Sequence, residues 1–149
     1  MTIYDRATRG MLAGTIAGLI TKVYDLLAYT LGISTLRWMD FSGIMLVGYK
    51  PERLMTQIIA TLGMLFFHAG MGIVFVYLIK PLSSRNLLLK GWFFGIVLWF
   101  AIYAVFHLFK VPEIASLPVR TLASSLAGAT IWGLSMAIII NWLDNRIKL

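Results

Sequence analysis

Two ionisable side chains, Lys22 and Asp25, lie inside the first long apolar stretch of this sequence. Three glycines, Gly10, Gly14 and Gly18, precede them at intervals of four residues. With 3.6 residues per turn, all five positions fall within about 120° of one helix face. Two overlapping G-x-x-x-G steps are typical of a surface on which another helix packs closely. The pattern therefore predicts that Lys22 and Asp25 point toward protein rather than toward lipid.

This face has a structural and a functional interpretation. A charge near the centre of a lipid-facing helix costs about 2.5–3.5 kcal/mol, so each side chain needs a partner or water. Lys22 and Asp25 are three residues apart and can pair, or Lys22 can extend its stem toward the interface. In the functional interpretation, Asp25 provides a proton or cation site that lines a cavity. The sequence leaves both open.

A second polar stripe follows in the next apolar stretch, where Gln57, Thr61 and Gly72 fall within about 40° of His68. An imidazole near the middle of a span is expected to bond to a neighbouring helix, and it can also relay protons because it titrates near neutral pH. His107 is expected at an interface. A metal site would need both histidines and a carboxylate to converge, but their expected depths differ by about 8–12 Å. We therefore expect no metal.

Small residues mark two further packing surfaces. Gly91 and Gly95 allow close helix contact in the third stretch. The fourth stretch carries small and polar residues within about 60° of one direction: Thr121, Ser124, Ser125, Gly128, Trp132 and Ser135. Packing is the favoured interpretation of this seam, and a permeation path lined by hydroxyls is the alternative.

The residues needed for catalysis are largely missing from the sequence. It has no cysteine, which excludes disulfides, thiolate metal sites and cysteine nucleophiles. It contains no G-x-S-x-G, H-E-x-x-H or Walker motif, and a serine beside His68 is the only formal nucleophile and base. We therefore expect neither enzymatic activity nor a cofactor.

The composition defines the elements that must position these residues. The 149 residues are 60% hydrophobic and only 13% charged, and the mean hydropathy is +0.86. Four apolar stretches, at about 8–31, 54–79, 91–109 and 121–141, are each long enough, or nearly so, to cross a hydrocarbon layer. We predict one all-α membrane domain over residues 1–149, a four-helix bundle with no room for a soluble domain.

The net charge of +7 is interpreted as a topology signal rather than as a nucleic-acid surface. Seven cations flank the termini and the loop between the second and third stretches: Arg6, Arg9, Lys80, Arg85, Lys90, Arg146 and Lys148. Five lie on the opposite side: Arg37, Lys50, Arg53, Lys110 and Arg120. The excess predicts that both termini are cytoplasmic and that the protein contacts anionic lipid headgroups.

The long first connection, residues 32–53, contains a short apolar run, Phe41–Gly48, after Trp38. A run of this length cannot span a membrane. It can lie in the interface as a short helix, with Trp38 and Tyr49 at headgroup level, or it can fold back over the bundle as a re-entrant lid.

The chain resembles the small four-helix bacterial membrane proteins of the YqhR and YagU type, an uncharacterised family. The resemblance covers most of the chain and consists of a glycine-rich first span, a histidine in FFHAG at residues 66–70, the segment KGWFFG at 90–95 that opens the third span, VFHLF at 105–109, and a proline-containing turn before a last span rich in small residues. It implies a multi-pass protein of the bacterial inner membrane and no particular activity.

Two functions remain as expectations. The first is a structural, accessory or regulatory membrane subunit, whether in a homo-oligomer or in a larger complex, whose polar seams hold its helices together. The second is a homo-oligomeric channel or carrier for protons or a small ion or solute, in which Asp25 and His68 line a hydrated path. The environment of Asp25, a hydrated cavity or a dry contact, distinguishes the two.

Overall fold

The structure is a computed structural model that describes residues 5–79 and 86–146, the side chain of residue 146 excepted. It contains six helices and, in these residues, no strand: α1 (Arg6–Thr30), α2 (Trp38–Val47), α3 (Leu54–Leu78), α4 (Leu87–Leu108), α5 (Pro112–Ala115) and α6 (Val119–Arg146). The all-α prediction is confirmed. Four helices, α1, α3, α4 and α6, are long and apolar enough to cross a membrane.

The predicted stretches match the long helices closely, except at the ends where polar residues continue a helix. The third long helix, α4, begins at Leu87 rather than at residue 91, and the fourth, α6, continues to Arg146 rather than ending at residue 141. Both extensions contain charged residues, Lys90 and Asp144, that hydropathy alone assigns to loops. Hydropathy locates the apolar core of a helix, whereas its backbone hydrogen bonds extend beyond that core.

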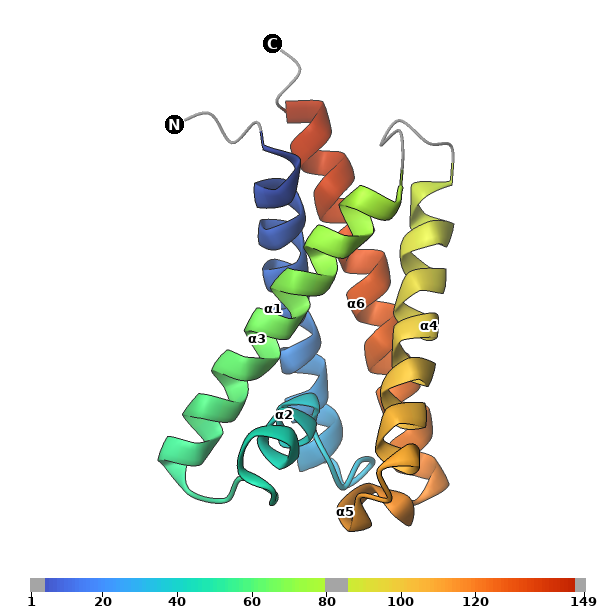
Figure 1. Ribbon diagram of the computed structural model, residues 1–149. Helices are drawn as coiled ribbons and strands as arrows, with labels where there is room; N and C mark the ends of the chain where they lie inside the picture. The colour runs from blue at the N-terminus through green and yellow to red at the C-terminus, as the bar shows by residue number, and fades with distance from the viewer. Residues whose placement is uncertain (1–4, 80–85, 147–149) are drawn as a thin grey trace.

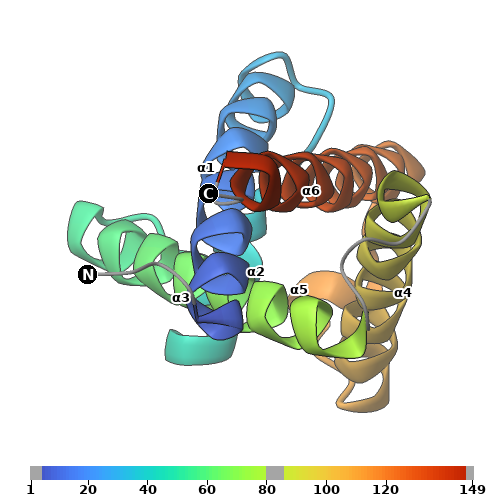
Figure 2. The same ribbon diagram turned by 90° about the horizontal axis from the view of Figure 1, so that it is seen from above.

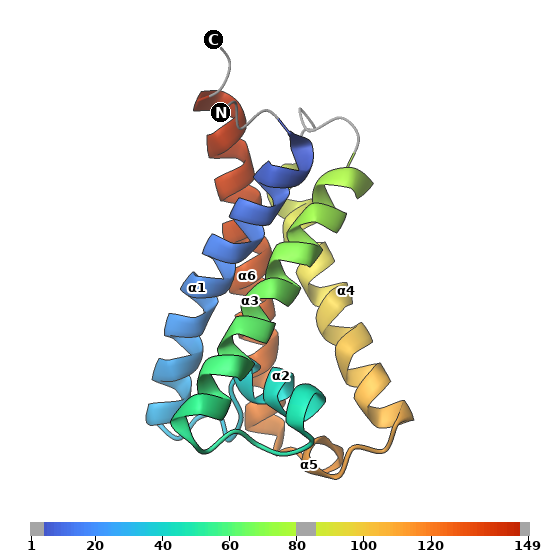
Figure 3. The ribbon, with the colours of Figure 1, turned by 60° about the vertical axis from the view of Figure 1, so that its left-hand side comes forward.

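The long helices pack in the order α3, α1, α6, α4 (Figure 2). α1 begins and α6 ends at the same end of the bundle (Figure 1). The last residue of α3, Leu78, and the first of α4, Leu87, also lie at this end. From there α3 and α4 diverge toward the opposite end, where α2 and α5 lie (Figure 3).

Glycines set the closest contacts between helices. A methyl group added at Gly10 would lie 2.5 Å from the carbonyl oxygen of Gly72, so α3 lies in the glycine groove of α1. Gly91 and Gly95 pack in the same way against α6, where an added methyl group would lie 2.5 Å from the carbonyl oxygens of Gly133 and Ala129 respectively. These contacts bring backbones together as expected for small-residue seams.

The first connection folds inward. It turns at Gly32, whose φ of +71° favours glycine, and α2 ends at Gly48, whose φ is +80°. One face of α2 is buried, with Phe41 packed against Tyr103 and Phe106 of α4. α2 therefore packs against the bundle, as the second of the two predicted arrangements requires, and its position relative to a membrane interface stays a prediction.

Candidate functional site

Asp25 links α1 to the start of α2. Its side chain is buried, at 7% exposure, and Oδ2 accepts a hydrogen bond of 2.9 Å from the backbone N–H of Trp38, the first residue of α2. The N-terminal N–H groups of a helix lack acceptors within the helix, and they favour a nearby carboxylate. Asp25 thus caps a helix that is separate from its own.

A buried ion pair completes the start of α2. Asp40 is fully buried, and its Oδ2 accepts from the backbone N–H of Arg37 at 2.8 Å while its Oδ1 accepts from Nη2 of Arg37 at 2.9 Å. The Arg37 guanidinium also lies 4.6 Å from the ring centroid of Tyr29 on α1. Lys50 donates to the carbonyl oxygen of Thr35 at 2.9 Å, which fastens the far end of the connection. The sequence analysis missed Asp40, although its i,i+3 spacing from Arg37 is a visible signal.

Lys22 does not pair with Asp25, which was one of the arrangements that their spacing allows. The Lys22 ammonium donates to Oγ1 of Thr61 on α3 at 3.2 Å, and within the described residues no ion pair joins it to Asp25. The two side chains share a helix face, but each finds a nearer partner on a different helix. The amide of Gln57, on the same face of α3, donates to the carbonyl oxygen of Glu52 at 3.1 Å, near the start of its own helix.

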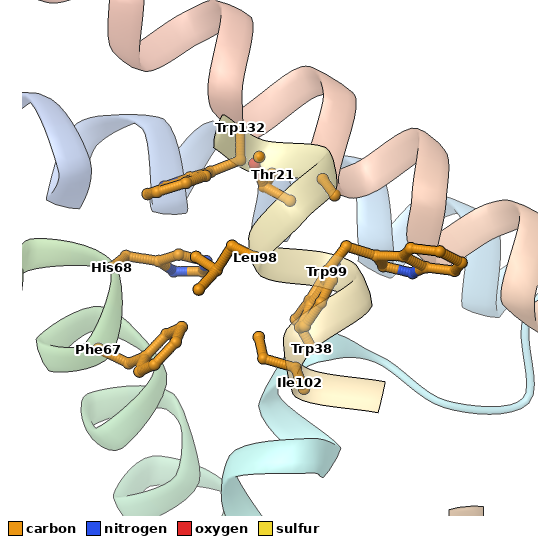
Figure 4. A pocket seen from close by; sticks show the side chains of 10 residues that line it. Thr21, Trp38, Phe67, His68, Leu98, Trp99, Ile102 and Trp132 are labelled. Atoms are coloured by element: carbon orange, nitrogen blue, oxygen red, sulfur yellow. The ribbon is translucent and has the colours of Figure 1, made fainter. Parts of the chain in front are cut away.

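His68 is buried at 6% exposure between α1 and α6. Its ring lies 5.2 Å from that of Trp132 (Figure 4), with an angle of 32° between the planes. Among the residues that the structure describes, its Nδ1 has no hydrogen-bond partner. A methyl group at Gly18 would lie 2.7 Å from this Nδ1, so the glycine makes room for the imidazole. His107, by contrast, is exposed in the last turn of α4.

The polar seam of α6 bonds to other parts of the chain. Oγ of Ser125 accepts from the Trp99 indole and shares a hydrogen bond with the Tyr103 hydroxyl, both at 2.9 Å. Further hydroxyl contacts join this helix to α1 and to the first connection: Tyr24 with Ser124 at 3.2 Å, and Thr35 with Thr121 at 3.0 Å. Gly128 faces the Trp38 indole, whose Nε1 is buried without a partner. The hydroxyl groups of the α6 seam therefore connect this helix to other parts of the chain.

Two cavities adjoin these residues, and His68 and Trp38 line both of them. The smaller, of about 20 Å³, lies among Thr21, His68, Trp132 and their neighbours, as Figure 4 shows. That volume is close to the minimum needed for a single water molecule. The larger, of about 430 Å³, lies between α2, α3 and α4 and is almost entirely apolar.

No protein-family model, curated protein or solved structure matches this chain.

Proposed function

We propose that this chain is a multi-pass protein of the bacterial inner membrane with a structural, accessory or regulatory role and no catalytic activity. Its four long helices expose large apolar side chains along their lengths, among them Leu54, Phe66, Phe93 and Phe100 at 62–76% exposure. Exposure of such an apolar surface to water is unfavourable, whereas contact with lipid chains is not. The cations at both ends of the bundle suit anionic headgroups.

The observation that carries the accessory role is the environment of Asp25. Its carboxylate bonds to the start of α2, and the nearby ammonium of Lys22 bonds to α3. An ion path requires polar groups that water or the ion can reach. Here the two ionisable side chains inside the apolar part of α1 join it to other helices, which favours a role in holding the fold together.

The alternative, a homo-oligomeric channel or carrier that uses Asp25 and His68, has one observation in its favour. Nδ1 of His68 is buried without a partner among the described residues, and it borders the small cavity, where a water molecule would donate a hydrogen bond to it. The cavity's volume of about 20 Å³ would hold about one water rather than a hydrated ion. This alternative therefore depends on a larger path that forms in an oligomer.

Reconstitution separates the two functions. Purified protein in lipid vesicles is tested for flux of H⁺, Na⁺ and K⁺ under imposed gradients and membrane potentials of both signs, with empty vesicles as the control. We expect no flux above that of empty vesicles. Flux that is present in the wild type and lost in the His68→Gln variant, with folding preserved, would overturn the accessory role and establish transport.

A further inference from the structure

The two cavities of the bundle are neighbours. The inner cavity, of about 20 Å³, has residues of all four long helices in its wall, and the outer cavity, of about 430 Å³, lies between α2, α3 and α4. Side chains of the outer cavity such as Met45 and Val105 are also exposed at the surface of the bundle, at 71% and 49%. Five side chains line both cavities and form a shared wall: Trp38, Phe67, His68, Leu98 and Ile102. The outer cavity therefore connects the surroundings of the bundle with the wall of the inner one.

Two polar atoms of this shared wall lack a hydrogen-bond partner. Among the described residues, Nδ1 of His68 and Nε1 of Trp38 are both buried and unpartnered. The two other indoles at the inner cavity are satisfied, because Trp99 donates to a serine hydroxyl at 2.9 Å and Trp132 to a backbone carbonyl at 3.3 Å. Buried polar groups are hydrogen-bonded in the great majority of cases. The two unpartnered atoms therefore point to a molecule from outside the chain that supplies the missing bonds.

His68 is the more deeply buried of the two residues. Its side chain is 6% exposed, and the imidazole extends from α3 into the inner cavity alongside Trp132 (Figure 4). Gly18 of α1 lies against Nδ1 and offers no side chain to bond to it. The neighbouring helix thus leaves this nitrogen without a protein partner.

The chemistry of the two atoms favours a hydroxyl group as their partner. The indole N–H of Trp38 can only donate, whereas Nδ1 of a neutral imidazole donates or accepts according to its tautomer. A hydroxyl oxygen accepts from the indole, and its proton is available for Nδ1 of His68. A carbonyl or ether oxygen cannot donate, so it satisfies His68 in one tautomer only. The inner cavity, of about 20 Å³, has room for about one such group.

The remainder of the ligand has to be apolar and uncharged. Among the described residues, no Asp, Glu, Lys or Arg lines either cavity, so a charged ligand would have no counter-ion there. The walls of the outer cavity are aliphatic, aromatic and thioether side chains, apart from Ser42 and the two polar residues of the shared wall. Its volume falls within the range of about 300–1,000 Å³ typical of ligand pockets with mostly apolar walls.

We propose that the two cavities form one binding site for a neutral, apolar molecule that ends in a hydroxyl group. The hydroxyl occupies the inner cavity, where it bonds to His68 and Trp38, and the apolar part occupies the outer cavity. This site does not rest on the accessory role, since a transport protein can contain it equally well and the flux measurement does not report on it.

Photolabelling with two matched probes tests the site. The full chain in nanodiscs is irradiated with octanol or with octane, each carrying a diazirine at the same position of the alkyl chain, and adducts are mapped by mass spectrometry. The probes differ only in the hydroxyl group. At equal concentration in the membrane, octanol should label the shared wall, for example Phe67 and Leu98, about fivefold more than octane, because only octanol forms the two hydrogen bonds.

Three variants assign this difference to the two polar atoms. His68→Leu removes the imidazole and retains an apolar side chain, so octanol labelling should fall about fivefold, to the level of octane, which should not change. Trp38→Phe removes the indole donor and should lower octanol labelling about threefold. His107→Leu, at an exposed position in the last turn of α4, is the matched control and should leave both probes unaffected.

Competition in the wild type gives a test that does not depend on the folding of a variant. Unlabelled 1-octanol should displace the octanol probe at about fivefold lower concentration than its methyl ether, which accepts a hydrogen bond but cannot donate one. Equal labelling by the two probes, or equal competition by alcohol and ether, would overturn the hydroxyl as the recognised group. Equal octanol labelling of the wild type and His68→Leu, or octanol adducts spread evenly over the lipid-facing surface, would overturn the site.

Discussion

Asp25 is the residue on which the local structure of the first connection depends most clearly. Trp38 is the first residue of α2, and its N–H would have no acceptor within that helix. The residue before it, Arg37, has a side chain that can only donate, so it cannot cap this group. The carboxylate of Asp25 reaches it from α1 instead. A charged residue inside a long apolar helix thus has a defined structural task.

Replacing Asp25 with Ala should lower the free energy of unfolding by about 1–2 kcal/mol, because the buried N–H of Trp38 loses its acceptor. Asp25→Asn should cost less, since the amide oxygen can still accept this bond. The measurement is denaturant unfolding in detergent micelles, followed by circular dichroism.

Lys22→Met provides the matched test of whether Asp25 and Lys22 act as a pair. Because Lys22 bonds to Thr61, the double variant Lys22→Met/Asp25→Ala should equal the sum of the single changes within about 0.5 kcal/mol. Substantial rescue of Asp25→Ala by Lys22→Met would show that the two charges interact after all.

Residue spacing predicted the direction of these side chains but not their partners. Helical periodicity correctly placed Lys22 and Asp25 on the face that packs against protein, because a helix fixes the angle between its own residues. It carried no information about Thr61 or the Trp38 N–H, since these belong to helices whose positions follow from tertiary packing. The nearest partner in the sequence was therefore the wrong one.

At the scale of elements, the contact between α1 and α3 depends on the absence of side chains. A methyl group added at Gly14 of α1 would overlap the backbone carbonyl of His68 on α3. A methyl group added at Gly70 of α3 would have no described atom within 4 Å. These two glycines lie in helices of similar apolar character but in opposite packing environments.

The same substitution should therefore have opposite effects at the two sites. Gly14→Ala should destabilise the protein by about 1–3 kcal/mol, because the helices must separate. Gly70→Ala should be neutral or stabilise it by up to about 1 kcal/mol, because alanine favours the helix and meets no obstruction. Thermal unfolding of both variants in one detergent makes the comparison. Equal stability of the two variants would mean that α3 does not lie in the groove of α1.

The four long helices could be predicted from hydropathy because each is defined by its own apolar length. The position of α2 in the bundle could not be predicted in this way. A ten-residue apolar helix satisfies its composition equally well at an interface or inside a bundle, and the choice depends on the space that α3 and α4 leave between them. The larger cavity between α2, α3 and α4 was unpredictable for the same reason: its walls come from three helices, and no one of them carries a distinctive motif.

At the scale of the whole molecule, both described ends of the chain lie on the same side of the bundle as the ends of α3 and α4 that flank residues 80–85. If the four long helices cross a membrane, their even number places both ends on the same side of it. The described cations of that side include Arg6 and Arg9, and Arg9 forms an ion pair with Asp144 that ties α1 to α6. Lys80, Arg85 and Lys148 of the sequence count lie outside the described residues.

We predict that this side faces the cytoplasm, because it carries seven of the twelve flanking cations. The chain has no cysteine, so Ser84→Cys and Ser116→Cys each introduce a single reactive thiol without a background. A membrane-impermeant maleimide should label position 116 in intact cells and position 84 only after permeabilisation. Labelling of position 84 from outside, with position 116 protected, would reverse the orientation and place α2 and α5 on the cytoplasmic face.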